Sequence, residues 1–125
     1  MTMAQTKTIM FGTATGENNL QVKIALGTVW MSQTDMALLF EKSKKTISSH
    51  VNNILKSGEV DKNKVIRNFK ITAKDYKLYD VDHYSIDMVI SVAYRVKSEQ
   101  ARFFRMWATE IVSKFIIDNL PENKN

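Results

Sequence analysis

The sequence contains no cysteine among its 125 residues. This excludes a disulfide scaffold, a thiolate zinc site and a cysteine nucleophile, and it gives no sign of an oxidising compartment. Long apolar runs are missing as well, because no segment approaches the roughly 18 uninterrupted apolar residues that a membrane-spanning helix requires. The first eight residues lack the apolar stretch of a signal peptide. We therefore expect a cytoplasmic protein with no membrane association.

Signals for catalysis are also scarce. His50 and His83 are the two histidines of the chain, and neither lies in a spacing typical of a metal site. Gly12 and Gly16 are not followed by the Lys-Ser/Thr pair of a phosphate-binding loop. We expect no metal, no cofactor and no enzymatic activity.

Negative charge is in short supply in the middle of the chain. The sequence carries 18 lysine and arginine residues against 13 carboxylates, a net charge of +5. Residues 32–79 hold ten of the basic residues and five of the carboxylates, so this span carries a net charge equal to that of the whole chain. A localised basic excess is typical of nucleic-acid binding. The alternative is a solvated lysine-rich surface.

Strand-prone and helix-prone segments alternate in a chain of ordinary globular composition, with 44% hydrophobic residues. We predict a single α+β domain over residues 1–125, a winged helix-turn-helix with an added N-terminal β-hairpin and a long C-terminal helix. The N-terminal hairpin is expected to have a loose turn that includes Gly12, Gly16 and 18–19. The predicted divisions are a hairpin at 8–26, a helix-turn-helix at 32–57, a wing hairpin at 65–84 and C-terminal helices at 85–119.

The helix-turn-helix prediction depends on caps and on apolar spacing. Ser32 is a good N-cap for a first short helix that ends near Phe40. A second helix is expected from about residue 45 to 57, because its apolar residues recur at i, i+4, i+7 and i+8, and Gly58 then supplies a stop. Two short helices followed by a hairpin are the element order of a winged helix. Glu41 stands where such turns often carry glycine.

The second predicted helix has one polar face without a carboxylate. Asparagine, serine and lysine are side chains that read bases or hold phosphates. The wing hairpin adds further cations, which would meet backbone phosphates of double-stranded DNA. The alternatives are an ordinary solvated helix face and an edge hairpin that resists aggregation. The predicted DNA-binding residues are Lys44, Lys45, Thr46, Ser48, Ser49, Asn52, Asn53, Lys56, Arg67, Lys70, Lys74 and Lys77.

The last predicted helix, from Glu99 to about Asn119, is apolar over most of its circumference. Ser85 and Ser98 are expected to cap the two C-terminal helices. Core packing accounts for part of the apolar surface, and a homodimer interface or a missing C-terminal domain would account for the rest. The residues expected at this dimer or partner interface are Phe103, Phe104, Trp107, Ile111 and Phe115. A second basic cluster (Arg95, Lys97, Arg102 and Arg105) has no assigned role.

Several stretches resemble the N-terminal domain of the RhuM-type virulence proteins. They are Val29–Gln33, Asp35–Phe40, Thr46–Ile54, Gly58–Val60, Tyr84–Ser98 and Phe103–Thr109, within a resemblance that runs from about residue 8 to 119. Ala93 replaces the glycine that is commoner in the family before Tyr94.

The resemblance implies a bacterial or phage-derived domain, similar to phage antirepressor-type modules and presumed to bind DNA in transcription regulation. Similar domains also precede Fic-type catalytic domains in longer chains. Two alternatives stay open. One is a protein-interaction or dimerisation module that has lost DNA binding, and the other is a regulatory N-terminal piece of a larger enzyme.

Overall fold

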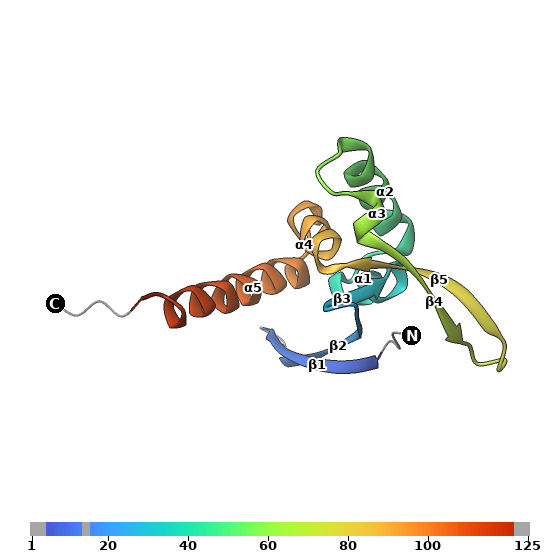
Figure 1. Ribbon diagram of the computed structural model, residues 1–125, viewed down its shortest axis with the longest axis horizontal. Coiled ribbons are helices and arrows are strands. Elements are labelled where there is room, and N and C mark those ends of the chain that lie inside the picture. Colours follow the sequence, from blue (N-terminus) through green and yellow to red (C-terminus); the bar gives the residue numbers. More distant parts are fainter. Residues whose placement is uncertain (1–4, 14–15, 122–125) are drawn as a thin grey trace.

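The fold is α+β, as predicted. The computed structural model describes residues 5–13 and 16–121, and these residues form five helices and one five-stranded antiparallel sheet of order β1-β2-β3-β5-β4 (Figure 1). The strands are β1 (Gln5–Thr13), β2 (Gly16–Ala25), β3 (Thr28–Ser32), β4 (Ile66–Thr72) and β5 (Leu78–Ser85). The helices are α1 (Gln33–Phe40), α2 (Lys44–Ser57), α3 (Lys62–Val65), α4 (Ile86–Arg95) and α5 (Glu99–Asp118).

The N-terminal hairpin is longer than its apolar pattern predicts. β1 and β2 pair from Gln5 opposite Ile24 to Thr13 opposite Gly16, so Gly12 and the 18–19 pair lie in strands. The expected loose turn through these residues is therefore wrong, because paired strands satisfy their backbone N–H and C=O groups even through a polar stretch. Residues 14 and 15 lie outside the described part of the chain.

Strand β3 has no counterpart among the predicted elements. A turn with left-handed backbone at Leu26 (φ 54°) and Gly27 (φ 75°) leads into it. β3 pairs with β2 on one side and with β5 on the other, where Trp30 lies opposite Ser85. This short strand therefore joins the N-terminal hairpin to the β4–β5 hairpin in one sheet.

Helices α1 and α2 follow the predicted boundaries closely. Ser32 and Asp35 form a reciprocal capping box, in which the Ser32 hydroxyl accepts the Asp35 N–H at 3.1 Å and the Asp35 carboxylate accepts the Ser32 N–H at 3.2 Å. Glu41 ends α1 with a left-handed backbone (φ 52°), the conformation for which glycine is usual. Gly58 (φ 77°) ends α2 as predicted.

The C-terminal half contains one unpredicted helix and one failed cap. α3 is a four-residue turn of helix that places Val65 in the core before β4 begins. Ser85 occupies the N-cap position of α4, but its buried hydroxyl has no hydrogen-bond partner, so the predicted capping bond is wrong. The Ser98 hydroxyl accepts the Ala101 N–H at 3.0 Å and caps α5 as predicted.

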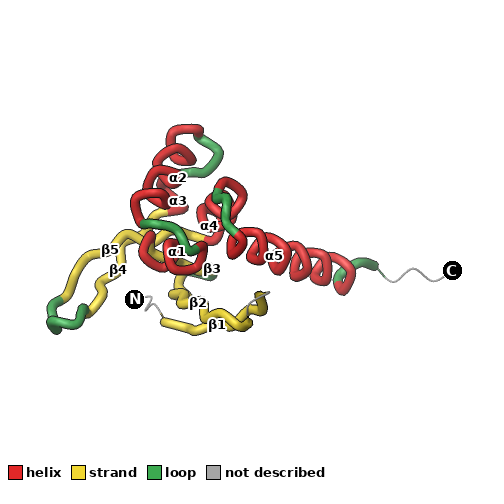
Figure 2. Tube along the Cα trace, turned by 180° about the vertical axis from the view of Figure 1, so that it is seen from behind, coloured by secondary structure: helices red, strands yellow, loops and turns green. Residues whose placement is uncertain are grey.

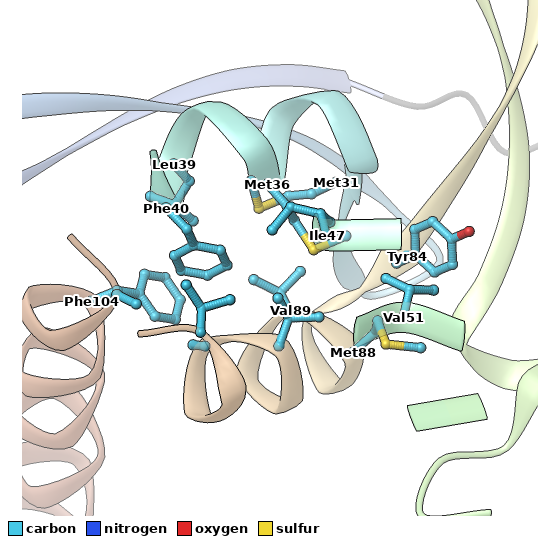
Figure 3. Packing of buried hydrophobic residues seen from close by; sticks show 14 of the residues in the cluster. Met31, Met36, Leu39, Phe40, Ile47, Val51, Tyr84, Met88, Val89 and Phe104 are labelled. Atoms are coloured by element: carbon cyan, nitrogen blue, oxygen red, sulfur yellow. The ribbon is translucent and has the colours of Figure 1, made fainter. Parts of the chain in front are cut away.

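The core lies where α1, α2, α4 and the first part of α5 meet (Figure 3). Phe40 of α1 packs edge-on against Phe104 of α5, with ring centroids 5.5 Å apart. Met88 and Val89 of α4 are completely buried between these helices and α2. This packing fixes which face of α2 is turned away from the body.

Two elements extend from the body in opposite directions. The β4–β5 hairpin projects on one side, and the C-terminal half of α5 projects on the other (Figures 1 and 2). Every residue from Thr109 to Pro121 is exposed. Within the described ranges, no helix combines the length and apolar character needed to cross a membrane.

Candidate nucleic-acid interface

The outward face of α2 is polar and basic. Ile47, Val51 and Ile54 are completely buried on the inner face. The helix contains three lysines and no carboxylate, and among the described residues none of these lysines forms an ion pair. The predicted DNA-binding residues of α2 that are exposed are Lys44, Lys45, Ser49, Asn52, Asn53 and Lys56.

Thr46 and Ser48 are placed differently from their predicted companions, because both are half-buried. The Ser43 hydroxyl accepts the Thr46 N–H at 3.1 Å and donates to the Thr46 hydroxyl at 3.0 Å. Thr46 therefore belongs to the N-cap of α2. This cap holds the first turn of the helix, where exposed N–H groups favour a phosphate.

The start of α2 lies beside the base of the β4–β5 hairpin. Lys44, Thr34 and residues 80–82 of β5 line one shallow hollow of about 380 Å³. Across the rim of this hollow, the Gln33 side-chain amide donates to the Tyr84 hydroxyl at 3.0 Å. α2 and the hairpin therefore border a single surface.

The structure does not bring the four predicted cations of the hairpin together. Lys70 forms a 3.0 Å ion pair with Asp80 across the strands. Arg67 lies opposite His83, three residues along β4 from Lys70 and therefore on the other face of the ribbon. The hairpin carries four cations and three carboxylates, a net charge of only +1. Lys74 and Lys77 are exposed at its tip.

Asp75 organises the tip. Its carboxylate accepts the Tyr79 hydroxyl at 2.6 Å and the Lys77 N–H at 3.0 Å. The Tyr79 hydrogen bond, followed by that of the Lys77 backbone, lowers the pKa of Asp75, and the same contact with Asp75 raises the pKa of Tyr79. The Asp75 carboxylate is therefore ionised and occupied by the turn itself.

His83 is a buried titratable group on β5. It is 2% exposed, its Nδ1 lies 2.9 Å from the Val81 carbonyl oxygen, and the Phe69 ring packs edge-on against it. Burial lowers the pKa of His83, and the Val81 carbonyl opposes that shift only in part. His83 also lines a hollow of about 450 Å³ together with Lys23 and Asp35.

The five residues predicted at a partner interface separate into two groups. Phe104 is 2% exposed and lies in the core of the chain, so its assignment to an exposed interface is wrong, because its ring fills space beside Phe40. Trp107 is half-buried against the same core. Phe103 is half-buried with the Arg102 guanidinium 5.0 Å above its ring, whereas Ile111 and Phe115 are 49% and 67% exposed.

Three members of the second basic cluster have structural partners. Arg95 pairs with Glu59, and the Arg105 guanidinium donates to the carbonyl oxygens of Ala93 and Val96. The Arg105 bonds tie the α4–α5 connection together, and the Arg95 pair links the end of α4 to the segment that follows α2. Arg102 lies 3.9 Å from Glu99, and Lys97 is exposed.

A comparison with protein families gives a match to the C-terminal part of the chain. Residues 64–121 match the virulence protein RhuM family. The similarity to the RhuM family is thus confined to the C-terminal part of the chain. The RhuM match covers the β4–β5 hairpin, α4 and α5, and it begins after α2. Neither the curated proteins nor the solved structures yielded a match.

The sequence pattern left two features of this surface unmarked. Asp80 and Asp82 offset the hairpin cations, and only the strand register pairs them with Lys70 and Asn68. Tyr76 stands at the hairpin tip with a left-handed backbone, and the local sequence carries no glycine or asparagine to mark that position.

Proposed function

We propose that this chain is a DNA-binding domain of the winged helix-turn-helix type that acts in transcription regulation, as a repressor or antirepressor of bacterial or phage origin. In this proposal α2 enters the major groove and the tip of the β4–β5 hairpin meets the phosphate backbone. The partner is double-stranded DNA, and no catalytic step is involved.

One observation carries the proposal: the exposed face of α2 combines serine, asparagine and lysine with no carboxylate. Stable surface helices usually mix glutamate with lysine, because pairs at i and i+4 support the helix. Serine and asparagine are weaker helix formers than alanine or glutamate, so this face gives up local stability for short hydrogen-bonding groups. Asparagine can bond adenine through two hydrogen bonds, and lysine can contact guanine or phosphate.

The inner face of α2 supports the same reading. Ile47, Val51 and Ile54 lock the helix to the body, so its outer face is presented as a rigid surface. A B-DNA major groove, about 12 Å wide, admits one α-helix. α2 has 14 residues and is held by the Ser43 cap and the Gly58 stop.

The test replaces Lys45, Ser49 and Asn52 together with alanine. All three are exposed and alanine favours helix, so the fold should be retained. Affinity for duplex selected by the wild-type chain should fall at least tenfold, measured by fluorescence anisotropy at two salt concentrations. If Lys45 holds a phosphate, the log–log salt slope should also drop by about 0.9.

The matched control is the double variant Ser113→Ala with Lys114→Ala. It also removes one exposed lysine and one exposed serine, but from the projecting half of α5. This control should bind duplex as the wild type does. Equal losses in both variants would mean that the chain attracts DNA only by net charge, and an unchanged triple variant would overturn the role of α2.

A second function is favoured by a separate observation on α5, namely its exposed apolar side chains. Ala101, Phe104 and Ala108 occupy one face of the helix, and the same face continues through Ile111 and Phe115. Its first part is buried by the body, whereas the continuation is exposed. The projecting half also exposes Val112, Ile116, Ile117 and Leu120, each by more than half.

We infer that this face pairs with α5 of a second copy and makes the domain a homodimer. An apolar groove of about 210 Å³ between α4 and α5, lined by Ile90, Tyr94, Ala108 and Val112, adjoins the same face. A groove and an apolar helix on one chain can satisfy each other across a two-fold axis. Contiguous exposed apolar surface is typical of interaction sites.

Analytical ultracentrifugation of two aspartate variants tests the dimer. Ile111→Asp places a charge on the shared face and should give monomers. Ile117→Asp is the control, because Ile117 is 68% exposed but lies roughly opposite that face, and it should stay dimeric. A monomeric wild-type chain would contradict the homodimer and leave the face to a different partner or to a C-terminal domain. Equal dissociation of both variants would contradict the pairing face.

A further inference from the structure

Tyr76 is the most exposed large apolar side chain in the described part of the molecule. It is 91% exposed at the tip of the β4–β5 hairpin, the element that projects farthest from the body on its side (Figure 1). Among the described residues, its side chain makes no hydrogen bond and no ring contact. The ring therefore contributes nothing to the packing of its own chain.

The backbone conformation at Tyr76 is also unusual for a bulky residue. The last strand pair is Thr72 with Leu78, and the Ala73 N–H donates to the Lys77 carbonyl at 3.0 Å, so residues 74–76 form a three-residue loop. Such loops place their last residue in the left-handed region, where glycine is usual. Tyr76 has φ 63°, a conformation that bulky residues rarely adopt.

Neighbouring residues hold the tip in this shape. The Tyr76 N–H donates to the Ala73 carbonyl at 2.9 Å. Asp75 accepts hydrogen bonds from the Tyr79 side chain and the Lys77 backbone. The turn is therefore braced from within, while an aromatic ring that the turn disfavours points away from the chain. Backbone strain that is not offset by side-chain packing is typical of functional positions.

We propose that Tyr76 is a wedge that enters the minor groove of the duplex held by α2, an inference that rests on the proposed DNA-binding function. The minor groove, about 6 Å wide, is too narrow for a helix but accepts an inserted side chain. Apolar wedges there partly unstack a base step and bend the duplex. Lys74 and Lys77 are exposed at the same tip and would meet phosphates beside the groove.

The first test compares Tyr76→Gly with Leu38→Ala, since Leu38 on α1 is another highly exposed large apolar side chain, at 75%, and belongs to neither proposed binding surface. Glycine adopts φ 63° without strain, so Tyr76→Gly should keep or raise the melting temperature. Its affinity for the selected duplex should nevertheless fall about tenfold. Leu38→Ala should leave the affinity unchanged. A lower melting temperature with unchanged affinity would show that Tyr76 is structural and would overturn the wedge.

The second test isolates the minor groove. Exchanging the G·C pairs next to the selected site for inosine·C pairs removes the minor-groove amino group and leaves the major-groove edges intact. Wild-type affinity should rise at least threefold, because the amino group obstructs the groove floor, and Tyr76→Gly should not respond. An equal response of both proteins would overturn minor-groove entry.

Different results would contradict the Tyr76 wedge and the DNA-binding function. Wild-type binding that is weakened by the α2 variant but not by Tyr76→Gly would overturn the wedge alone. A wild-type chain that binds no duplex at low salt would overturn the DNA-binding function, and the wedge with it.

Discussion

Helices α2 and α5 differ in how much of their apolar surface the fold buries. Both are amphipathic, and both begin at a serine cap. α2 buries its apolar stripe completely at Ile47, Val51 and Ile54 and partly at Leu55, and it exposes a polar face without carboxylates. α5 buries its stripe only as far as Phe104 and then carries apolar side chains into the open.

This contrast is the basis of the two proposals, each with its own kind of partner. A polar face on a firmly packed helix suits a ligand that offers hydrogen-bonding groups and phosphates, as a DNA groove does. An apolar face on a projecting helix suits another protein surface. The chain thus places a proposed reading element and a proposed assembly element on different sides of one core.

The largest expected effect is a loss of folding stability when a buried residue of α2 is truncated. Ile54→Ala should lower the free energy of unfolding by about 2–5 kcal/mol, because Ile54 is completely buried and its truncation leaves a cavity. Ile117→Ala should change it by no more than about 0.5 kcal/mol, as is usual for exposed sites. Urea denaturation at low protein concentration measures both. A large loss from Ile117→Ala would mean that the end of α5 is packed.

A second prediction concerns the pH dependence of folding stability, which depends on His83 in the body and not on α5. Burial holds the pKa of His83 below its usual 6.5, so the unfolded state binds the proton more readily. Stability should therefore be full above about pH 6.5 and fall as the pH drops below it. His83→Gln should flatten this dependence, whereas His50→Gln on α2 should keep it. Thermal melts from pH 7.5 to 5 provide the measurement, and an unchanged slope in His83→Gln would contradict the assignment.

The smallest expected effect concerns the hairpin ion pair. Lys70 and Asp80 have side chains that are 68% and 61% exposed, and exposed pairs contribute about 0.2–1 kcal/mol. A double-mutant cycle of Lys70→Ala and Asp80→Ala should return a coupling energy in that range, and it should shrink with added salt. A larger coupling energy would mean that the pair is less accessible to solvent than its exposed fractions indicate.

Much of the helical architecture could be predicted because its signals are local. Ser32, Ser98 and Gly58 act at the helix ends where they stand in the sequence. β3 and α3 could not be predicted in the same way. Each is short, and each is stabilised by partners distant in sequence, as the pairing of Trp30 with Ser85 illustrates.

The candidate site was predictable on α2 and much less so on the hairpin. The sequence assigns the charge excess to residues 32–79, a span whose end falls inside β5. Asp80 and Asp82 lie just beyond it, and the strand register places them opposite Lys70 and Asn68. Helix periodicity assigns a face directly, whereas the surroundings of a strand residue depend on its neighbour.

Selection of bound sequences from a random duplex library tests the central claim most directly. The wild-type chain should enrich a short motif, and the motif should be a palindrome if the α5 dimer forms. The triple variant at Lys45, Ser49 and Asn52 should fail to enrich it under identical salt. Failure of the wild-type chain to enrich any sequence, or enrichment of the same motif by the triple variant, would contradict the assignment of α2 as the DNA-reading helix.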